Sequence, residues 1–518
     1  MQMCSYDEIA AFVKENLYDY RGYELLSEYY SDKNIKQEYL CLENALFYAK
    51  EPDDIQRLTK KMAEVSERGG SVPKTAMVIL SYNNRVVTQN CLESIRDTTP
   101  ESAREIVVVD NASADDSVDY LKQQKDIIIK VNYENAGFPK GCNQGIAMAQ
   151  KESDILLLNN DTVMMPNTLF WLRMGLYENE YIGAAGSVSN KAWKQWSGEK
   201  EGTLEYFRKH SETVNIPMKN PVEYRTWLVG FCVLVKRHVM NELNGLDEIF
   251  SPGNGEDNDM GIRIHKLGYV CALIRNSYIV HMEHASFGTR PDYIRLLNEA
   301  NGKIYRKHGF DMFYHYYGND NIGCFYRDIS AKGRVLEINC SVGGTIYEWH
   351  AKYPENEYVG IDREEASAAV RDHNPIFDLS TYTDIKDADV EGEFDCICLD
   401  TRTIKRSELE EYIKFGYEHL KTGGEFLLSV RNPKFFQEWI PFLLDDYVNV
   451  DDKREMIIPK QVEDCIARSG MKTKLWTFSF ADIPNDSRGM KIKEILNGLP
   501  KEFSDKVTIK NVCFVATK

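Results

Sequence analysis

The chain has 518 residues, too many for one compact hydrophobic core, so two or three domains are expected. Hydrophobic residues make up 43% of the sequence and charged residues 28%, an ordinary balance that excludes a disordered or fibrous protein. The formal net charge of −17 argues against a nucleic-acid backbone or an anionic membrane as the main partner.

The N-terminal sequence predicts helices, and the chain as a whole predicts a cytoplasmic protein. Residues 1–20 have no apolar core flanked by basic residues, so we expect no signal peptide. No apolar run reaches the length of a membrane span, and the 12 cysteines lack the paired spacing of metal sites. Apolar residues recur at helical spacing up to about residue 68, and a linker with Gly, Ser and Pro follows.

Short β-rich runs then alternate with amphipathic segments, twice along the chain. The expected strands are 75–82, 104–110, 125–131 and 154–161 in the first series, and 333–339, 357–362, 394–400 and 424–430 in the second. This alternation predicts an α/β fold with parallel sheets, and ligands at the carboxyl ends of the strands. The expected domains are a helical N-terminal region (1–72), a first α/β domain (73–310), a linker (311–332) and a second α/β domain (333–518).

Polar side chains follow the first two strands, where this fold places a ligand. Ser81, Tyr82 and Asn83 end the first strand, and Asp110 and Asn111 end the second. A carboxylate such as Asp110 can accept hydrogen bonds from a nucleoside, or it can cap the helix that follows. The residues alone leave both interpretations open.

The next two strands end in a glycine-containing loop and in a carboxylate. In the loop, Gly137 lets the backbone approach a phosphate or ribose, and Lys140 is placed to face a diphosphate. The fourth strand ends in Asn159, Asn160 and Asp161, where an oxygen ligand suits Mg²⁺ or Mn²⁺, although Asn-Asn-Asp is also good turn chemistry.

Two later segments supply candidate acids and histidines. Glu256, Asp257 and Asp259 begin a helix, where acids serve as a charged cap or, crowded beside a glycine-rich loop, as a source of a catalytic base. His281 and His284 follow a further strand. One of them can complete a metal shell, although a single histidine is more often structural.

Taken in order, VILSYNN, VVDNASADDS, NAGFPKGCNQG, LLLNNDT and GLDEIF…GEDNDMGIRIHKLGY resemble the family 2 inverting glycosyltransferases of the GT-A fold, over about Lys74 to Lys307. The resemblance implies a nucleotide-sugar donor, with Asp110 at the nucleoside. The candidate donor-binding residues are Ser81, Tyr82, Asn83, Asp110, Asn111, Gly137, Phe138, Lys140, Asn143 and Asn160.

The same resemblance implies the roles of the metal ligands and the base. The family's Asp-x-Asp metal motif matches Asn159-Asn160-Asp161, so Asp161 and one of His281 and His284 are the implied ligands of Mn²⁺ or Mg²⁺. Asp257, beside Glu256, is the implied catalytic base of a single displacement that inverts the anomeric carbon.

The segment from Asn190 to Tyr224 carries aromatic side chains among polar ones. Trp193, Trp196, Tyr206 and Phe207 can stack on an acceptor sugar, or they can pack the segment against its own domain.

The second α/β series resembles class I S-adenosylmethionine-dependent methyltransferases over about Gly333 to Asn432. That family's acidic-x-Gly-x-Gly-x-Gly loop has Asn339 and Ser341 in place of two glycines here, whereas Asp362 stands where the ribose-binding acid is expected. The two replacements argue against S-adenosylmethionine as a cofactor and favour a scaffold or acceptor-docking role. The retained Asp362 leaves nucleoside binding open.

The leading hypothesis is an inverting glycosyltransferase that uses a UDP- or dTDP-sugar. Its acceptor would be a hydroxyl on a surface glycan or on a protein such as flagellin. The alternatives are a bifunctional enzyme that also methylates, and a glycan-binding module that has lost its chemistry.

Overall fold

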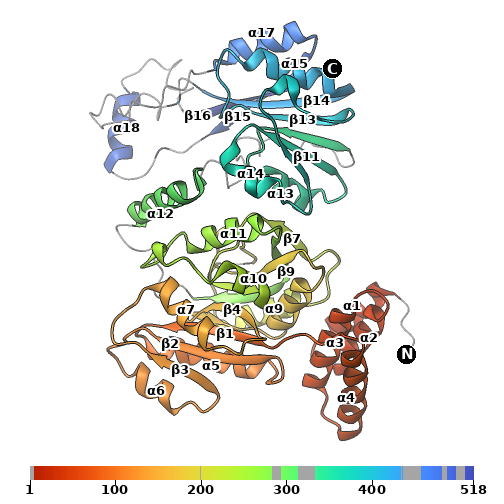
Figure 1. Ribbon diagram of the computed structural model, residues 1–518, viewed down its shortest axis with the longest axis vertical. Helices are drawn as coiled ribbons and strands as arrows, with labels where there is room; N and C mark the ends of the chain where they lie inside the picture. Colours follow the sequence, from red (N-terminus) through yellow and green to blue (C-terminus); the bar gives the residue numbers. More distant parts are fainter. Residues whose placement is uncertain are drawn as a thin grey trace. The chain divides into compact units, whose positions relative to one another are not determined.

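The computed structural model describes residues 5–198, 200–282, 293–312, 333–432, 457–480, 487–497 and 508–518, with residues 435 and 483. The chain forms two compact units, Met1–Met312 and Phe313–Lys518 (Figure 1). The α/β class with a helical N-terminal region is confirmed, and the finer limits at residues 72, 310 and 332 stay predictions.

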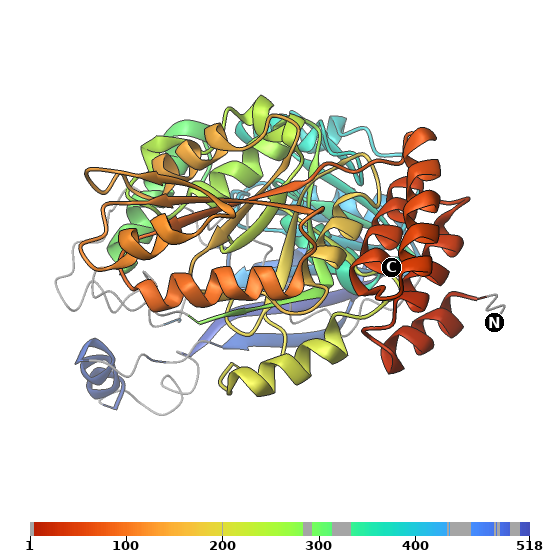
Figure 2. The same cartoon turned by 90° about the horizontal axis from the view of Figure 1, so that it is seen from below.

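The first unit begins with a bundle of four helices. They are α1 (Tyr6–Glu15), α2 (Tyr20–Tyr30), α3 (Ile35–Tyr48) and α4 (Pro52–Glu67). Ser5 forms a capping box with Glu8 at the start of α1, and the Asn34 side chain accepts backbone N–H groups at the start of α3. Helices α2, α3 and α4 pack side by side in sequence order (Figures 1 and 2).

This bundle shares a hydrophobic core with α8 (Thr168–Leu176), a helix of the α/β part of the same unit. Leu26 and Leu40 of the bundle belong to one buried cluster with Phe170, Trp171 and Met174 of α8. Because every residue of α8 is buried, the helix is covered on both sides: the bundle lies on one face and strands of the sheet on the other.

Buried polar contacts reinforce this junction. Arg173 of α8 forms an ion pair with Glu43 of α3, and both side chains are almost fully buried. Asn167, which precedes α8, accepts a hydrogen bond from Tyr48 (2.9 Å) and donates one to Tyr23 (2.7 Å). The bundle is therefore fixed to α8 by directional contacts as well as by apolar packing.

The sheet of the first unit has the order β3-β2-β1-β4-β8-β6-β9-β5, with β7 paired to β9. Its strands are β1 (Thr75–Ser81), β2 (Arg104–Asp110), β3 (Ile127–Val131), β4 (Asp154–Asn159), β5 (Thr162–Val163), β6 (Ile182–Ser189), β7 (Val222–Arg225), β8 (Cys232–Val235) and β9 (Val270–His281). The helices of this part are α5 (Arg85–Thr98), α6 (Ser117–Gln123), α7 (Phe138–Met148), α8, α9 (Leu204–Val214), α10 (Arg237–Leu243), α11 (Glu256–Lys266) and α12 (Tyr293–His308), with a short 3₁₀ helix at Glu248–Phe250.

The expectation of a wholly parallel sheet was wrong for this unit. Strands β3, β2, β1 and β4 are parallel, as their alternation with helices predicted, but β8 is antiparallel to both β4 and β6. Residues 182–235 supply β6, α9, β7 and β8, whose long, irregular spacing breaks the simple alternation. The parallel half still brings the ends of β1, β2 and β4 to one edge.

The second unit has a seven-stranded sheet in the order β12-β11-β10-β13-β14-β16-β15. Its strands are β10 (Arg334–Ile338), β11 (Glu357–Asp362), β12 (Asp378–Thr381), β13 (Phe394–Asp400), β14 (Leu420–Arg431), β15 (Lys472–Phe480) and β16 (Ile509–Thr517). Its helices are α13 (Gly344–Lys352), α14 (Glu365–Arg371), α15 (Leu409–His419), α17 (Pro459–Ser469) and α18 (Ser487–Asn497), with a 3₁₀ helix at Ile385–Asp387. Only β16 runs against its neighbours on both sides.

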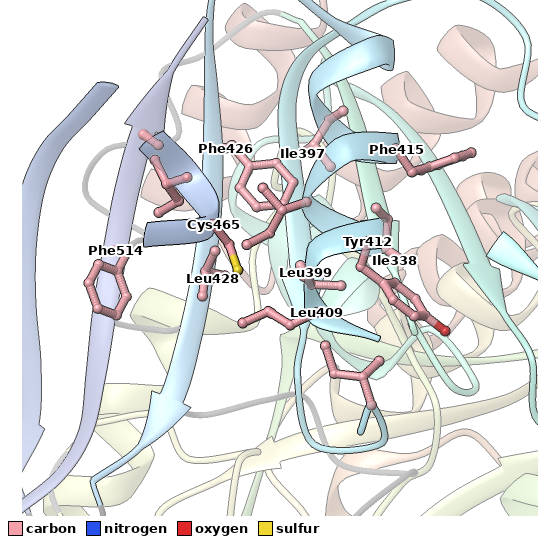
Figure 3. Packing of buried hydrophobic residues seen from close by; sticks show 14 of the residues in the cluster. Ile338, Ile397, Leu399, Leu409, Tyr412, Phe415, Phe426, Leu428, Cys465 and Phe514 are labelled. Atoms are coloured by element: carbon pink, nitrogen blue, oxygen red, sulfur yellow. The ribbon is translucent and has the colours of Figure 1, made fainter. Parts of the chain in front are cut away.

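The core of the second unit lies between its sheet and two helices. Ile397, Leu399 and Phe426 of the sheet pack against Leu409 of α15 and Cys465 of α17 (Figure 3). Across the described part of both units, the cysteines are buried and free, and no described helix is long and apolar enough to cross a bilayer.

Candidate functional site

Asp110 closes the turn after β2. Its carboxylate accepts hydrogen bonds from the backbone N–H (2.9 Å) and the hydroxyl (2.6 Å) of Ser113, and it is fully buried. Ser113 Oγ accepts the backbone N–H of Asn83, and Asn83 Oδ1 accepts that of Ala114. Asp110 and Asn83 thus join the loops that follow β1 and β2, and their contact with a nucleoside stays a prediction.

Two other candidate residues converge on one hydroxyl of α5. Ser81 Oγ lies 3.1 Å from Thr88 Oγ1, and Asn160 Nδ2 donates to the same oxygen at 2.9 Å. Both side chains therefore fasten strand ends to α5, a role that the sequence analysis did not consider. Tyr82, which follows Ser81, is 52% exposed, so its ring is accessible to a ligand.

Asn111 organises the loop that precedes α7. Its amide nitrogen donates to Asn135 Oδ1 (2.8 Å), and its amide oxygen accepts the backbone N–H of Ala136 (2.9 Å). Gly137 has a φ of +81°, and a Cβ there would lie 2.3 Å from Ser251 Oγ. The glycine is therefore required by the chain around Ser251, which explains its presence without a phosphate.

The start of α7 is also held by neighbouring segments. Phe138 donates its backbone N–H to the carbonyl of Pro252 (2.8 Å), and Asn143 exchanges two hydrogen bonds with the backbone of Leu246, each 2.8 Å long. Lys140 is exposed, so its ammonium is accessible to an anionic ligand.

Asp161 and His281, two of the side chains predicted to bind a metal, lie next to each other. Asp161 Oδ1 lies 3.2 Å from His281 Nε2, and both side chains are largely buried. His281 Nδ1 lies 3.0 Å from the carbonyl oxygen of Lys191, and a carbonyl can only accept, so Nδ1 carries the proton. If the ring is neutral, its lone pair is then on Nε2, the atom that faces the Asp161 carboxylate.

Two ligands fit a divalent cation that takes its remaining ligands from phosphate oxygens and water. Among the described residues, no cluster of three or more His, Cys, Asp or Glu side chains is close enough to hold an ion. His284, the alternative ligand, lies outside the described residues. A pocket of about 230 Å³ opens beside Asp161, with Asn90, Arg208 and Met282 in its lining.

Glu256 and Asp257 form a partly buried pair of acids at the start of α11. Asp257 Oδ2 accepts the backbone N–H of Gly230 (3.2 Å), and Oδ1 accepts that of Asn258 (2.8 Å). Burial raises the pKa of Asp257, and burial together with the charge of Asp257 raises the pKa of Glu256 to about 8. Both shifts favour the neutral form of these acids, and the charge of one disfavours ionisation of the other, so the pair favours a state with a single negative charge.

Asp259, the third acid, belongs to a structural ion-pair cluster instead. Its carboxylate contacts Arg263 (2.7 Å), Lys307 (2.6 Å) and His308 (2.8 Å), which ties α11 to α12. Burial alone would raise the pKa of Asp259, but the His308 hydrogen bond and the charges of Arg263 and Lys307 lower it to about 2. Asp259 therefore has a structural role rather than a catalytic one, but it acts through ion pairs and not as a helix cap.

Replacing Asp259 with Asn is expected to lower the stability of the first unit by about 2 kcal/mol at pH 7. Because the pKa of Asp259 is lower in the folded state, its ionised carboxylate stabilises the fold at pH values above the unfolded pKa of 3.8. This stabilisation is lost as the pH falls toward the folded pKa of about 2. Urea unfolding at pH 7 and at pH 3 measures this. The gap between wild type and variant should narrow at the lower pH, and an equal gap at both would contradict the ion-pair role.

Gly230 and Phe231 connect the Glu256–Asp257 pair to the Asp161–His281 pair. The backbone of Gly230 holds Asp257, while the carbonyl of Phe231 accepts the backbone N–H of Asn159 at the end of β4 (2.9 Å). The Phe231 ring stacks on His281, with centroids 5.2 Å apart. Asp161 and Asp257 therefore flank one two-residue segment. The role of Gly230 and Phe231 was not predicted from the sequence, although a glycine inside the apolar run LVGFCVLV signals close backbone approach.

The aromatic residues of the 190–224 segment divide between surface and core. Trp193, Trp196 and Tyr206 are 58%, 55% and 40% exposed, whereas Phe207 is buried. The packing interpretation is therefore right for Phe207, and the other three rings remain candidates for stacking on a sugar.

In the second unit, the loop after β10 is closed by its own side chains. Asn339 and Ser341 both have positive φ, 63° and 53°. Both oxygens of Asp362 accept backbone N–H groups, from Ser341 (2.6 Å) and Glu364 (2.7 Å), and the Asn339 amide accepts the hydroxyl of Tyr382 (2.6 Å). The loop keeps the backbone shape of a glycine-rich turn, but it carries the side chains of Asn339 and Ser341 where that turn has glycines, which is a poor fit to S-adenosylmethionine.

Comparison with known proteins supports two different likenesses. Residues 77–238 match the family model for glycosyl transferase family 2. A curated relative, the uncharacterised glycosyltransferase YfnE of Bacillus subtilis (strain 168), is 25% identical over 269 residues, which cover 43% of this chain and 68% of YfnE.

Similar solved structures occur for each part of the chain. The mannosyltransferase PcManGT from Pyrobaculum calidifontis, solved with GDP-Man and Mn²⁺, is 17% identical with a TM-score of 0.35, covering 52% of this chain and 76% of its own. A SAM-dependent methyltransferase from Archaeoglobus fulgidus is 16% identical with a TM-score of 0.28, covering 38% of this chain and 91% of its own.

Proposed function

We propose that the protein transfers a sugar from a nucleotide-sugar to an acceptor hydroxyl, because residues 77–238 match the family model for glycosyl transferase family 2. The observation that carries this proposal is the arrangement around Gly230 and Phe231. One side of this segment holds Asp257, and the other contacts the Asp161–His281 pair.

The chemistry follows from what the two sides offer. The acceptor oxygen attacks the anomeric carbon as the bond from that carbon to the diphosphate breaks, so the configuration inverts. The Asp257 carboxylate takes the proton of the attacking hydroxyl, and the raised pKa of Glu256 favours its neutral form beside that carboxylate. Asp161 and His281 would hold a divalent cation, which would neutralise the negative charge on the departing diphosphate.

The proposal also covers the chemical class of the donor and of the acceptor. A UDP- or dTDP-linked hexose or deoxyhexose is the proposed donor, with Tyr82 and Lys140 as exposed contacts for it. A surface glycan or a protein such as flagellin is the proposed acceptor. The exposed rings of Trp193 and Trp196 support a sugar-bearing acceptor, because such rings stack on the apolar face of a pyranose.

Replacing Asp161 with Ala is expected to raise the Mn²⁺ concentration needed for half-maximal activity by about 10- to 100-fold. The reason is that His281 Nε2 would remain as the single described protein ligand. The assay is hydrolysis of UDP-glucose, UDP-galactose and dTDP-rhamnose, measured as released nucleotide across a Mn²⁺ titration.

The matched control is Asp119→Asn, an exposed acid of α6 that should leave the Mn²⁺ titration unchanged. Chelator should abolish wild-type hydrolysis. If neither chelator nor Asp161→Ala changed hydrolysis, the proposed metal role would be wrong. If none of the nucleotide-sugars were hydrolysed, the proposed glycosyltransferase activity would be contradicted.

The second unit is proposed as a scaffold or acceptor-docking domain. Each carboxylate oxygen of Asp362 accepts a backbone N–H group, and the Asn339 side chain accepts the hydroxyl of Tyr382. These contacts favour neither methyl transfer nor the bifunctional alternative.

A further inference from the structure

The loop that follows β6, residues 190–197, lies against the segment that precedes β8. The ring of Trp193 in this loop and the ring of Trp227 in that segment have centroids 5.8 Å apart. Two residues further along both, Gln195 Oε1 accepts the backbone N–H of Val229 (2.5 Å). The loop and the segment therefore run side by side, joined by one aromatic contact and one hydrogen bond.

The side chain of Gln195 is buried, and both ends of its amide are engaged. While Oε1 accepts the Val229 N–H, Nε2 donates to the carbonyl of Ser187 in β6 (2.9 Å). Strand β6 is buried along its whole length, so this second bond fastens the amide to the interior of the sheet. Because the nitrogen can only donate and the oxygen can only accept, the amide has one orientation. Gln195 thereby fixes the Val229 backbone relative to the sheet.

The next residue along the chain, Gly230, packs directly on the proposed catalytic base. Its backbone N–H donates to Asp257 Oδ2 (3.2 Å), and a Cβ at Gly230 would lie 3.4 Å from the Cβ of Asp257. The Val229 carbonyl and the Gly230 N–H belong to one planar peptide unit, so a change in the Val229 backbone moves the donor that Asp257 uses. A displacement of about 1 Å at a reacting group can cost about 10²-fold in rate.

We propose that Gln195 is a positioning residue for Asp257, which it orients through the Val229–Gly230 peptide and not by contact with the substrate. This inference rests on the proposed function, in which Asp257 is the base. It assigns a role in the reaction to a buried amide of the loop that also carries the exposed ring of Trp193.

The proposed link has a consequence for the titration of Asp257. Burial raises the pKa of Asp257, and the Gly230 N–H opposes this rise because it stabilises the ionised carboxylate. Glu256, beside Asp257 on α11, is the acid whose charge couples to it, whereas neither Val229 nor Gly230 has a titratable side chain. If the Gly230 N–H moves away, the pKa of Asp257 should therefore rise further.

Gln195→Met tests this role in the full chain, because it nearly keeps the side-chain volume but removes both hydrogen bonds. The assay is hydrolysis of UDP-glucose, UDP-galactose and dTDP-rhamnose, in which water replaces the acceptor. We expect kcat to fall by about 10- to 100-fold while the donor KM stays within about twofold. The decrease of kcat/KM at low pH should begin at a higher pH than in wild type, a change that lower stability alone would not produce. Hydrogen exchange followed by mass spectrometry should show faster exchange at Val229 and Gly230.

Two further variants separate positioning from a general loosening of the loop. Gln195→Glu keeps an oxygen that accepts the Val229 N–H, so it should retain more of kcat than Gln195→Met. Thr203→Ala removes the exposed N-cap of α9, beyond the other end of the same loop, and should leave kcat and the pH profile unchanged. Thermal unfolding confirms that each variant is folded.

The outcomes distinguish this inference from the proposed function. If wild type hydrolysed no donor, the proposed function would fail and the inference with it. If wild type were active, the inference alone would be overturned by a Gln195→Met variant with wild-type kcat, pH profile and exchange at Val229 and Gly230. It would also be overturned if Thr203→Ala changed kcat as much as Gln195→Met.

Discussion

Asp257→Asn is expected to lower kcat/KM for sugar transfer by about 10²- to 10⁴-fold, the usual contribution of a general base. The amide keeps the shape of the side chain and can still accept the backbone N–H of Gly230, but it cannot take a proton from the acceptor. Nucleotide-sugar binding should be nearly unchanged, so the loss should appear in kcat. Steady-state kinetics and donor titration calorimetry together measure this split.

The pH profile gives an independent readout of the same residue. Because burial raises the pKa of Asp257, wild-type kcat/KM should fall as the pH drops through that raised value, since only the ionised carboxylate acts as a base. The residual activity of the Asn variant should lose this limb. If Asp257→Asn kept both the wild-type rate and the decrease of kcat/KM at low pH, another residue would be the base. Asp119→Asn serves as the exposed control.

Removing one partner of the buried Arg173–Glu43 ion pair is expected to destabilise the first unit by about 3–5 kcal/mol. Both side chains are almost fully buried, so Glu43→Gln leaves the Arg173 charge without its carboxylate partner. Arg173 also donates to the carbonyl of Pro73 (2.9 Å), which joins α8 to the segment that precedes β1. Denaturant unfolding, followed by tryptophan fluorescence, measures the loss.

A double replacement separates the charge from the packing. Arg173→Met combined with Glu43→Leu should recover most of the lost stability, since a buried pair exchanged for apolar side chains is often close to neutral. The matched control is the exposed pair Glu205–Lys209, where Glu205→Gln should change stability by less than about 1 kcal/mol. If Glu43→Gln were as mild as Glu205→Gln, the pair would not hold the junction.

The sequence was informative where local pattern decides the structure. The apolar, β-branched runs that became β1, β2 and β4 were predictable, and so was the emergence of Asp161 where β4 ends, because strand period and strand ends are local properties. The pairing of β8 against β4 was not predictable, since antiparallel insertion depends on which edges meet after the chain has folded.

The same limit applied to the acids of α11. Nothing in the local sequence distinguishes Asp257 from Asp259, two positions apart. The difference arises from residues remote in the chain, because Gly230 faces Asp257 and Lys307 and His308 face Asp259. Likewise, the structural use of Gly137 depended on Ser251, more than a hundred residues later.

The shared core of the bundle and α8 bears on how far the unit can be shortened. A fragment that began at β1 would turn Phe170 and Met174 toward water and would strand the Arg173 guanidinium without Glu43. Residues 5–67 are consequently part of the folded core of their unit and not a removable appendage, even though a Gly-Gly-Ser segment follows them. Any trimming of this protein toward a minimal enzyme would have to spare its first four helices.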